Sequence, residues 1–185
     1  LSDLREQMKG RVMLIIQPAE ETGAGAAAML AAGVFADDRL PRCVLALHDH
    51  PTIAVGRVGS CPGYSSANVD GFRQTVKGIG GHGAYPHTAV DPVGLAARIV
   101  LGLNDLVARE IDVHTPAVIT VGSIHGGTKN TVSPDEVVLE ATVRTHDGAT
   151  RLLIPEKVQQ LASGLAAAAG APEPVLEYDF GTPAG

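Results

Sequence analysis

The hydrophobic pattern of the first third of the chain predicts two buried strands with a helix between them. Residues 12–16 (VMLII) and 43–47 (CVLAL) are short, continuous apolar runs. Such runs are typical of parallel strands that are covered on both faces. Between them, residues 23–35 are rich in alanine, which favours a helix, although the glycines in this stretch weaken it. Strand, helix and strand in this order predict a βαβ unit with a right-handed crossover.

A different pattern begins after residue 67. Strands are predicted at residues 69–77, 117–124, 136–145 and 175–180, and in the third of these alternate positions are apolar, so one face should be buried. A helix with Pro92 in its first turn precedes the second strand, and one with Pro155 near its start and Gly170 as C-cap precedes the fourth. Their apolar stripes are Val93, Ala97, Val100, Leu103 and Val107 in the first helix, and Val158, Leu161, Leu165 and Ala168 in the second.

The order β-α-β-β-α-β is that of a ferredoxin-like fold, in which two helices cover one face of a four-stranded antiparallel sheet. We therefore predict two units. Residues 1–67 should be part of a doubly wound α/β domain, and residues 68–178 a small α+β domain. Residues 179–185 should return to the first domain.

Composition and charge exclude several classes of partner. A net charge of −6, no cluster of Lys or Arg, and 3% aromatic residues argue against nucleic acid binding. No apolar run approaches the roughly 20 residues that span a bilayer, so no membrane partner is expected. The cysteines lack metal-binding spacing, which fits reduced thiols and a cytoplasmic location. The chain starts in what resembles the end of a helix, so its native N-terminus is expected further upstream.

Candidate metal ligands follow both apolar runs of the first unit. Glu20 and Glu21 come soon after the first run, and His48 follows the second directly. In open α/β sheets, ligands bind beyond the carboxyl ends of the strands. A divalent cation compensates adjacent carboxylates there, and imidazole is the commonest metal ligand. The alternatives are a solvated loop or a helix N-terminus for the two glutamates, and a structural role for His48.

Five motifs, in order, resemble the M20 metallopeptidase family, in its aminoacylase and hippurate-hydrolase branch. Together they span nearly all of residues 8–180. The motifs are Gln17-Pro18-Ala19-Glu20-Glu21; Ala46-Leu47-His48 with Pro51; Gly78-Ile79-Gly80-Gly81-His82-Gly83-Ala84 with Pro86-His87 and Asp91-Pro92; Gly122-Ser123-Ile124 with Gly126-Gly127 and Asn130-Thr131-Val132-Ser133-Pro134; and Val143-Arg144-Thr145.

The resemblance implies an amidohydrolase that cleaves the amide bond of N-acyl amino acids or related dipeptides. It implies two divalent metal ions, zinc before manganese, cobalt or nickel, held by a catalytic domain to which residues 1–67 belong. Residues 68–178 would form a lid that also makes a homodimer. Glu20 would be the general base and then acid, and Glu21 and His48 would be metal ligands.

The resemblance also implies roles for three residues of the lid. His82 would reach the partner's active site and stabilise the oxyanion, while Asn130 and Arg144 would bind substrate. The alternatives are turn roles for His82 and Asn130, and a cross-strand ion pair for Arg144.

The family's other metal-binding segments lie outside residues 1–185, so this chain alone should not hold the complete metal pair and is expected to be inactive by itself. A non-catalytic dimerisation module is therefore the alternative function. A protein that binds acylated amino acids without cleaving them is a third, which the presence of Glu20 disfavours.

Overall fold

The structure is a computed structural model that describes residues 2–36 and 40–185. These residues separate into two compact units, 1–56 and 57–185, which we describe one at a time. No helix in the described part of the chain combines the length and the apolar character that a membrane crossing requires. The predicted boundary at residue 67 remains a prediction.

The first unit contains short helices and, within its described residues, no strand. These helices are η1 (Ser2–Gln7), η2 (Glu20–Thr22) and α1 (Ala24–Ala31), the last of which confirms the helix predicted within residues 23–35. The prediction of strands at 12–16 and 43–47 is wrong for this chain, in which Leu14 and Leu45 are 83% and 90% exposed. A fully apolar strand needs paired edges and covered faces, and no strand lies beside these segments in the described part of the unit.

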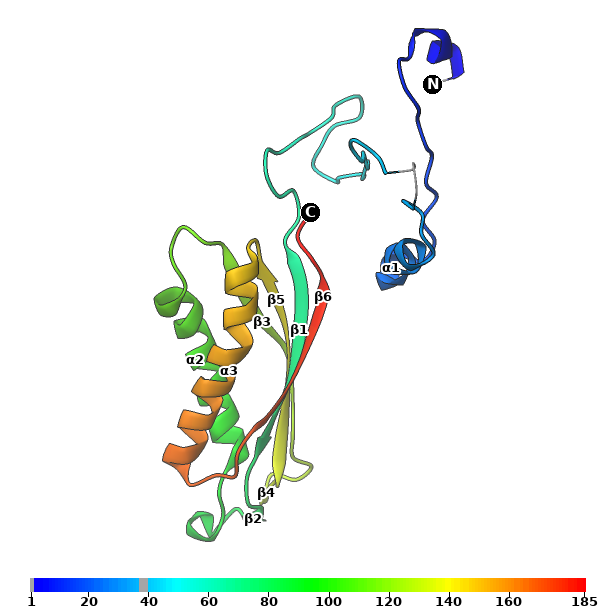
Figure 1. Cartoon of the computed structure of the whole chain (residues 1–185). Coiled ribbons are helices and arrows are strands. Elements are labelled where there is room, and N and C mark those ends of the chain that lie inside the picture. Colours follow the sequence, from blue (N-terminus) through cyan, green and yellow to red (C-terminus); the bar gives the residue numbers. More distant parts are fainter. Residues whose placement is uncertain (1, 37–39) are drawn as a thin grey trace. The chain divides into compact units, whose positions relative to one another are not determined.

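The second unit is built on a four-stranded antiparallel sheet. Its strands are β1 (Asn68–Lys77), β3 (Ala117–His125), β5 (Glu136–Thr145) and β6 (Val175–Thr182), in the order β3-β5-β1-β6 (Figure 1). Two short strands, β2 (Gly81–His82) and β4 (Val132–Ser133), pair separately. This strand order confirms the ferredoxin-like prediction.

Helices α2 (Pro92–Glu110) and α3 (Gly148–Ala169) cover one face of the sheet (Figure 1). Asp91 caps α2 by accepting hydrogen bonds from the amides of Val93 and Gly94, and Asp147 caps α3 through the amide of Thr150. Gly170 ends α3 in the left-handed region at φ 67°, as predicted. The core between the layers includes Val76, Leu95, Ile99, Leu139, Val143, Ile154 and Val158.

The apolar stripes predicted for the two helices are only partly correct. In α2 the predicted Leu103 is buried, and the predicted Val100 and Val107 pack against the core. The core also includes Leu95, Ile99 and Leu106, which were not predicted, whereas Val93 is 49% exposed and Ala97 is exposed. The helix has apolar residues on two adjoining faces, and the face with the larger side chains is buried against the sheet.

In α3 the buried stripe begins at Val158, as predicted, but continues through Ala162 and Ala166, one position beyond the predicted Leu161 and Leu165. The helix begins at Gly148, so Pro155 lies inside it. Small alanines on the buried face let α3 approach the sheet closely.

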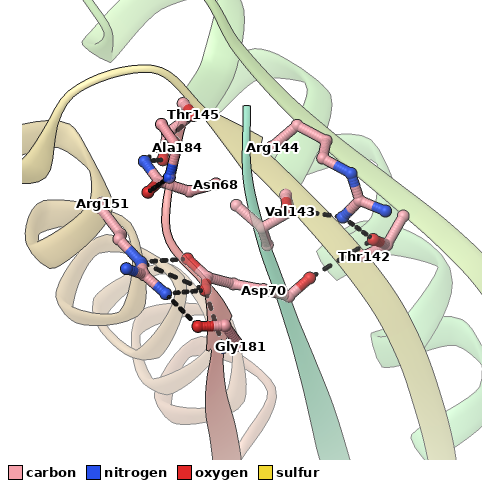
Figure 2. Close-up of polar contacts among 9 residues, drawn as sticks. All are labelled: Asn68, Asp70, Thr142, Val143, Arg144, Thr145, Arg151, Gly181 and Ala184. Atoms are coloured by element: carbon pink, nitrogen blue, oxygen red, sulfur yellow. Dashed lines mark hydrogen bonds and ion pairs between the residues drawn. The ribbon is translucent and has the colours of Figure 1, made fainter. Parts of the chain in front are cut away.

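A buried ion pair joins α3 to the sheet. The Asp70 side chain in β1 is fully buried, and Arg151 in the first turn of α3 is 16% exposed. Arg151 Nε lies 2.9 Å from Asp70 Oδ2 and Nη2 lies 2.6 Å from Oδ1, a bidentate contact, and the Gly181 amide donates to Oδ1 at 3.0 Å (Figure 2). The hydrogen bonds that Arg151 donates to the Asp70 carboxylate raise the pKa of Arg151 above its ordinary value. The pair thus fixes β1, α3 and β6 relative to one another.

The two ends of the second unit lie side by side. The amides of Ser65 and Ser66 donate to the carbonyl of Gly185, and the amide of Ala184 donates to Asn68 Oδ1 at 2.7 Å. Asn68 in turn donates to the backbone and the hydroxyl of Thr145 at the end of β5 (Figure 2). The segments that enter and leave the sheet are therefore tied to each other and to β5.

We expect Asp70→Ala to lower the free energy of unfolding of the second unit by about 3–5 kcal/mol, because it leaves the Arg151 guanidinium buried without a counter-charge. Urea denaturation followed by circular dichroism measures this. The control is Glu110→Ala, which breaks the more exposed Lys157–Glu110 pair and should leave stability nearly unchanged. Equal effects of the two substitutions would contradict a special role for the buried pair.

Candidate active site

A tight turn presents Glu20 and Glu21 at the surface of the first unit. Ala19, just before them, adopts the left-handed conformation at φ 52° and ψ 42°, which costs about 1–2 kcal/mol for a residue with a side chain. Gly23 closes the turn at φ 68°, also left-handed. Gly25 is buried so close to the carbonyl of Pro18 that a Cβ atom would lie 1.6 Å from its oxygen. Strained residues of this kind cluster at functional sites.

His48 lies in the same unit, with one ring nitrogen already engaged. Its Nδ1 is 2.6 Å from the carbonyl oxygen of Asp49, so Nδ1–H donates there and Nε2 stays free. This backbone hydrogen bond, and then the carboxylate of Asp49, raise the pKa of His48, and the charges of Glu20 and Glu21 raise it further. The two glutamates therefore lie within electrostatic range of the imidazole.

These side chains fit part of a metal centre. Histidine ligands usually donate the other ring N–H to a carbonyl or carboxylate, as Nδ1 of His48 does to Asp49. A cation would replace the proton that the surrounding negative charge favours on the ring. However, among residues 2–36 and 40–185 no three His, Cys, Asp or Glu side chains are grouped so that they could hold a metal ion. As the predicted ligands, Glu21 and His48 would therefore supply only an incomplete set.

His82 lies in β2 with a defined ring orientation. The amide of Ala84 donates to its Nδ1 at 3.1 Å, and the ring of Tyr85 lies 5.5 Å away, centre to centre. Because a backbone amide can only donate, Nδ1 must be the acceptor and the ring proton of neutral His82 must be on Nε2. The exposed Nε2–H is then a hydrogen-bond donor, which is what an oxyanion requires.

Asn130 lies two residues before β4, in the small lobe of the second unit that is formed by the pairing of β2 with β4 and that also holds His82. In this lobe His82 pairs with Val132, and the amide of Gly83 donates to the carbonyl of Thr131 at 2.7 Å. Asn130 is exposed beside this pairing. An open hollow of about 680 Å³ adjoins the lobe, lined by residues 125–128, 132–136 and Val138. The backbone pairing thus places Asn130 in the same lobe as His82.

Arg144 lies on the sheet face opposite the helices, which confirms the predicted polar face of β5. Its neighbours Val143 and Thr145 are fully buried on the other side. The alternative prediction of a cross-strand ion pair is wrong, because no carboxylate contacts Arg144 in the described part of the chain. Glu140 instead pairs with Arg73 at 3.6 Å.

Arg144 and the lobe of His82 lie at opposite ends of the sheet. The lobe adjoins the end where Val76 pairs with Val137, whereas Arg144 pairs with Val69. Seven residue steps of β5 separate Val137 from Arg144, which at about 3.3 Å per residue is about 23 Å. One copy of the second unit therefore does not bring Arg144 together with His82 and Asn130.

Sequence reasoning missed the residues that support these side chains. The ion pair between Asp70 and Arg151 was not predicted because the two residues are 81 positions apart in the sequence. The sequence did contain a signal, because Asp70 lies on the same face of β1 as the buried Phe72 and Gln74. A carboxylate on the buried face of a strand requires a partner. Thr142, which contacts Arg144, carried no such signal.

Comparison with known proteins identifies relatives over almost the whole chain. The profile of the family described as "Peptidase dimerisation domain" matches residues 64–169. An N-acetylcysteine deacetylase from Bacillus subtilis is 37% identical over 92% of this chain and 44% of its own length. An N-acyl-L-amino acid amidohydrolase from Geobacillus stearothermophilus is 33% identical over 98% of this chain and 51% of its own length. The chain thus spans about half the length of these curated relatives.

Two solved structures also align with most of this chain. A Bacillus subtilis protein described as a dinuclear metal binding peptidase from the M20 family has a TM-score of 0.67 and 31% identity, over 91% of this chain and 40% of its own. A crystal structure of a proposed aminohydrolase from methicillin-resistant Staphylococcus aureus has a TM-score of 0.88 and 33% identity, over 99% and 48%.

We expect nitrogen NMR of the protein at alkaline pH, where imidazoles are neutral, to find the His82 proton on Nε2 alone. The reason is the amide of Ala84, which occupies Nδ1 as a donor. His87 is the internal control, since its ring nitrogens have no hydrogen-bond partner in the described structure, and it should show both tautomers. A His82 spectrum in which Nδ1 carries the proton would refute the assignment.

Proposed function

The chain belongs to the M20 peptidase family, and from this membership we propose that the protein hydrolyses the amide bond of N-acyl amino acids or related dipeptides with the help of two divalent metal ions. The observation that carries the proposal is the strained turn that exposes Glu20 and Glu21 side by side in the same unit as His48. The names of the relatives, a deacetylase and an amidohydrolase of N-acylated amino acids, support this substrate class.

In the proposed reaction, Glu21 and His48 are metal ligands and Glu20 transfers protons. Metal ions, when bound, lower the pKa of water and polarise the carbonyl of the scissile amide. Glu20 takes a proton from the attacking water and later gives it to the departing amine. The exposed position of Glu20 in the turn leaves its carboxylate accessible to both groups.

His82, Asn130 and Arg144 are proposed to act on the substrate. The Nε2–H of His82 donates to the oxyanion, Asn130 hydrogen-bonds the substrate carbonyl, and Arg144 binds the α-carboxylate. The separation of about 23 Å between the two ends of the sheet exceeds the length of an N-acyl amino acid. A single site therefore requires Arg144 from one copy and His82 with Asn130 from a second copy, which makes a homodimer part of the proposal.

We place the dimer contact at the β3 edge of the sheet and the adjoining flank of α2. The β3 edge carries no Asp, Glu, Lys or Arg, whereas the β6 edge carries Glu177 and Asp179. Charges on an edge strand oppose pairing with another strand.

The α2 flank that faces away from α3 is also apolar. Gly102 faces Leu161 of α3, and Val93, Ala97, Val100 and Val107 follow the other flank of α2. Val93 and Ala97, the exposed members of the stripe predicted from the sequence, thus fit a contact with a second copy.

The metal is proposed to be zinc, because imidazole and carboxylate ligands suit it. Manganese, cobalt and nickel accept the same ligands, and coordination geometry selects among them. The cytoplasmic location likewise remains a prediction.

The alternative is a dimerisation module without catalysis. It is favoured by the lack of any group of three metal-ligating side chains in residues 2–36 and 40–185. Metal analysis of this chain together with light scattering separates the two. Stoichiometric metal contradicts the module, and a monomer contradicts its interface.

Activity in the full protein that carries this chain should depend on Glu20. We expect Glu20→Gln to lower kcat for a hippurate-like substrate by at least about 100-fold, because the amide cannot accept a proton from water. The metal content, measured by mass spectrometry, should not change. Glu6→Gln, the same chemical change at an exposed site of η1, is the matched control and should keep full activity. Undiminished turnover by Glu20→Gln would remove Glu20 from the mechanism.

Dimerisation should depend on the flank of α2. We expect Ala97→Lys to shift the protein toward the monomer in light scattering at micromolar concentration, because a desolvated ammonium would face an apolar contact. Ala168→Lys places the same charge on an exposed position of α3 and should leave the dimer intact. If both variants dimerise as the parent does, the contact lies elsewhere.

A further inference from the structure

Only one nitrogen of the Arg144 guanidinium makes hydrogen bonds within the described part of the chain. Its Nη1 donates to the hydroxyl of Thr142 and to the carbonyl of Val143, the latter at 2.9 Å (Figure 2). Its Nε and Nη2 have no hydrogen-bond partner in the described part of the chain, and the side chain is only partly exposed. The free edge of the guanidinium is therefore the one formed by Nε and Nη2.

The Thr142 hydroxyl accepts a hydrogen bond from Arg144 and donates one to the backbone of Asp70. A hydroxyl has one hydrogen, and that of Thr142 is donated to the carbonyl oxygen of Asp70 at 3.3 Å (Figure 2). Its oxygen is then available only as an acceptor, which suits a guanidinium and excludes a carbonyl. Thr142 and Arg144 project from the same face of β5, two residues apart.

The acceptor of this chain of hydrogen bonds is itself held rigidly. Asp70 pairs with Val143 across β1 and β5, and its carboxylate is fixed by Arg151 and the amide of Gly181. A shift of the Asp70 backbone, and with it of the carbonyl that Thr142 contacts, would disturb the buried ion pair. The position of Arg144 is thus coupled to the most constrained contact of the second unit.

Arg151 shows how a free edge of this kind binds a carboxylate. It holds Asp70 through Nε at 2.9 Å and Nη2 at 2.6 Å, the two donors that Arg144 leaves open. Two parallel N–H groups match the two oxygens of a carboxylate.

We propose that Thr142 is a positioning residue that, by holding Nη1, turns the Nε and Nη2 edge of Arg144 toward the α-carboxylate of the substrate. This rests on the proposed function, which makes Arg144 the carboxylate-binding residue. Thr142 itself does not touch the substrate. Its removal should affect binding of the carboxylate and leave the proton transfers of Glu20 unchanged.

A double-mutant cycle in the full protein tests this. Thr142→Val keeps the shape and removes the hydroxyl, and it should raise KM for an N-acyl amino acid about 10-fold, the size expected when one hydrogen bond to a charged group is lost, with kcat nearly unchanged. Thr142→Ser keeps the hydroxyl and should restore KM. With the carboxamide analogue of the same substrate, which lacks the carboxylate, Thr142→Val should have no effect.

The cycle is completed by Arg144→Met, alone and combined with Thr142→Val. Arg144→Met should raise KM strongly, and adding Thr142→Val to it should change nothing more. If Arg144→Met raises KM but Thr142→Val does not, the positioning role is overturned and the role of Arg144 stands. If Thr142→Val raises KM equally in both backgrounds or with the carboxamide, it acts through the fold and the proposal is overturned.

If Arg144→Met leaves KM unchanged, the carboxylate subsite of the proposed function is itself overturned, and the positioning role with it. Thr142→Ala is the second apolar variant, in case valine disturbs the strand, and it should raise KM as valine does. Thermal unfolding of each variant verifies that the fold is retained.

Discussion

The carboxylate of Asp70, buried between sheet and helices, is the constraint on which the second unit depends. A charge in such a place is stable only with a paired cation and satisfied oxygens, and Arg151 with the amide of Gly181 supplies both. Because these groups come from β1, α3 and β6, satisfying one carboxylate sets the positions of three elements. The backbone carbonyl of Asp70 also accepts the hydrogen bond of Thr142, and the oxygen of Thr142 in turn holds Nη1 of Arg144.

The two faces of the sheet differ in what they carry. One face is covered by α2 and α3 and carries the apolar core together with the buried Asp70, while the opposite face carries polar side chains that include Arg144. The length of the strands keeps Arg144 far from the lobe that holds His82 and Asn130. A rigid sheet cannot fold back to close that distance, so a site that used all three residues would have to be assembled from two copies. The uncharged edge of β3 and the apolar flank of α2 are then the surfaces suited to join them.

The first unit shows how much local structure survives when predicted strands have no partners. Its apolar runs stay exposed, because pairing and covering are properties of a whole sheet. The turn at Glu20 and Glu21 nevertheless forms, since it depends on neighbours in sequence: the left-handed Ala19 and Gly23, and the contact of Gly25 with Pro18. The hydrogen bond from His48 to the carbonyl of Asp49 is equally local.

The sequence by itself determined the order of elements in the second unit, the polar face of β5 and the C-cap at Gly170, because alternation, helical periodicity and glycine preference act over a few residues. Only the tertiary structure decided which apolar stripe of α2 enters the core, which cation meets Asp70, and how far Arg144 lies from His82. Each of these depends on residues distant in the chain, 81 positions apart for Asp70 and Arg151. Local patterns limit such pairings without selecting among them, because the choice follows from how layers pack and how strands are registered.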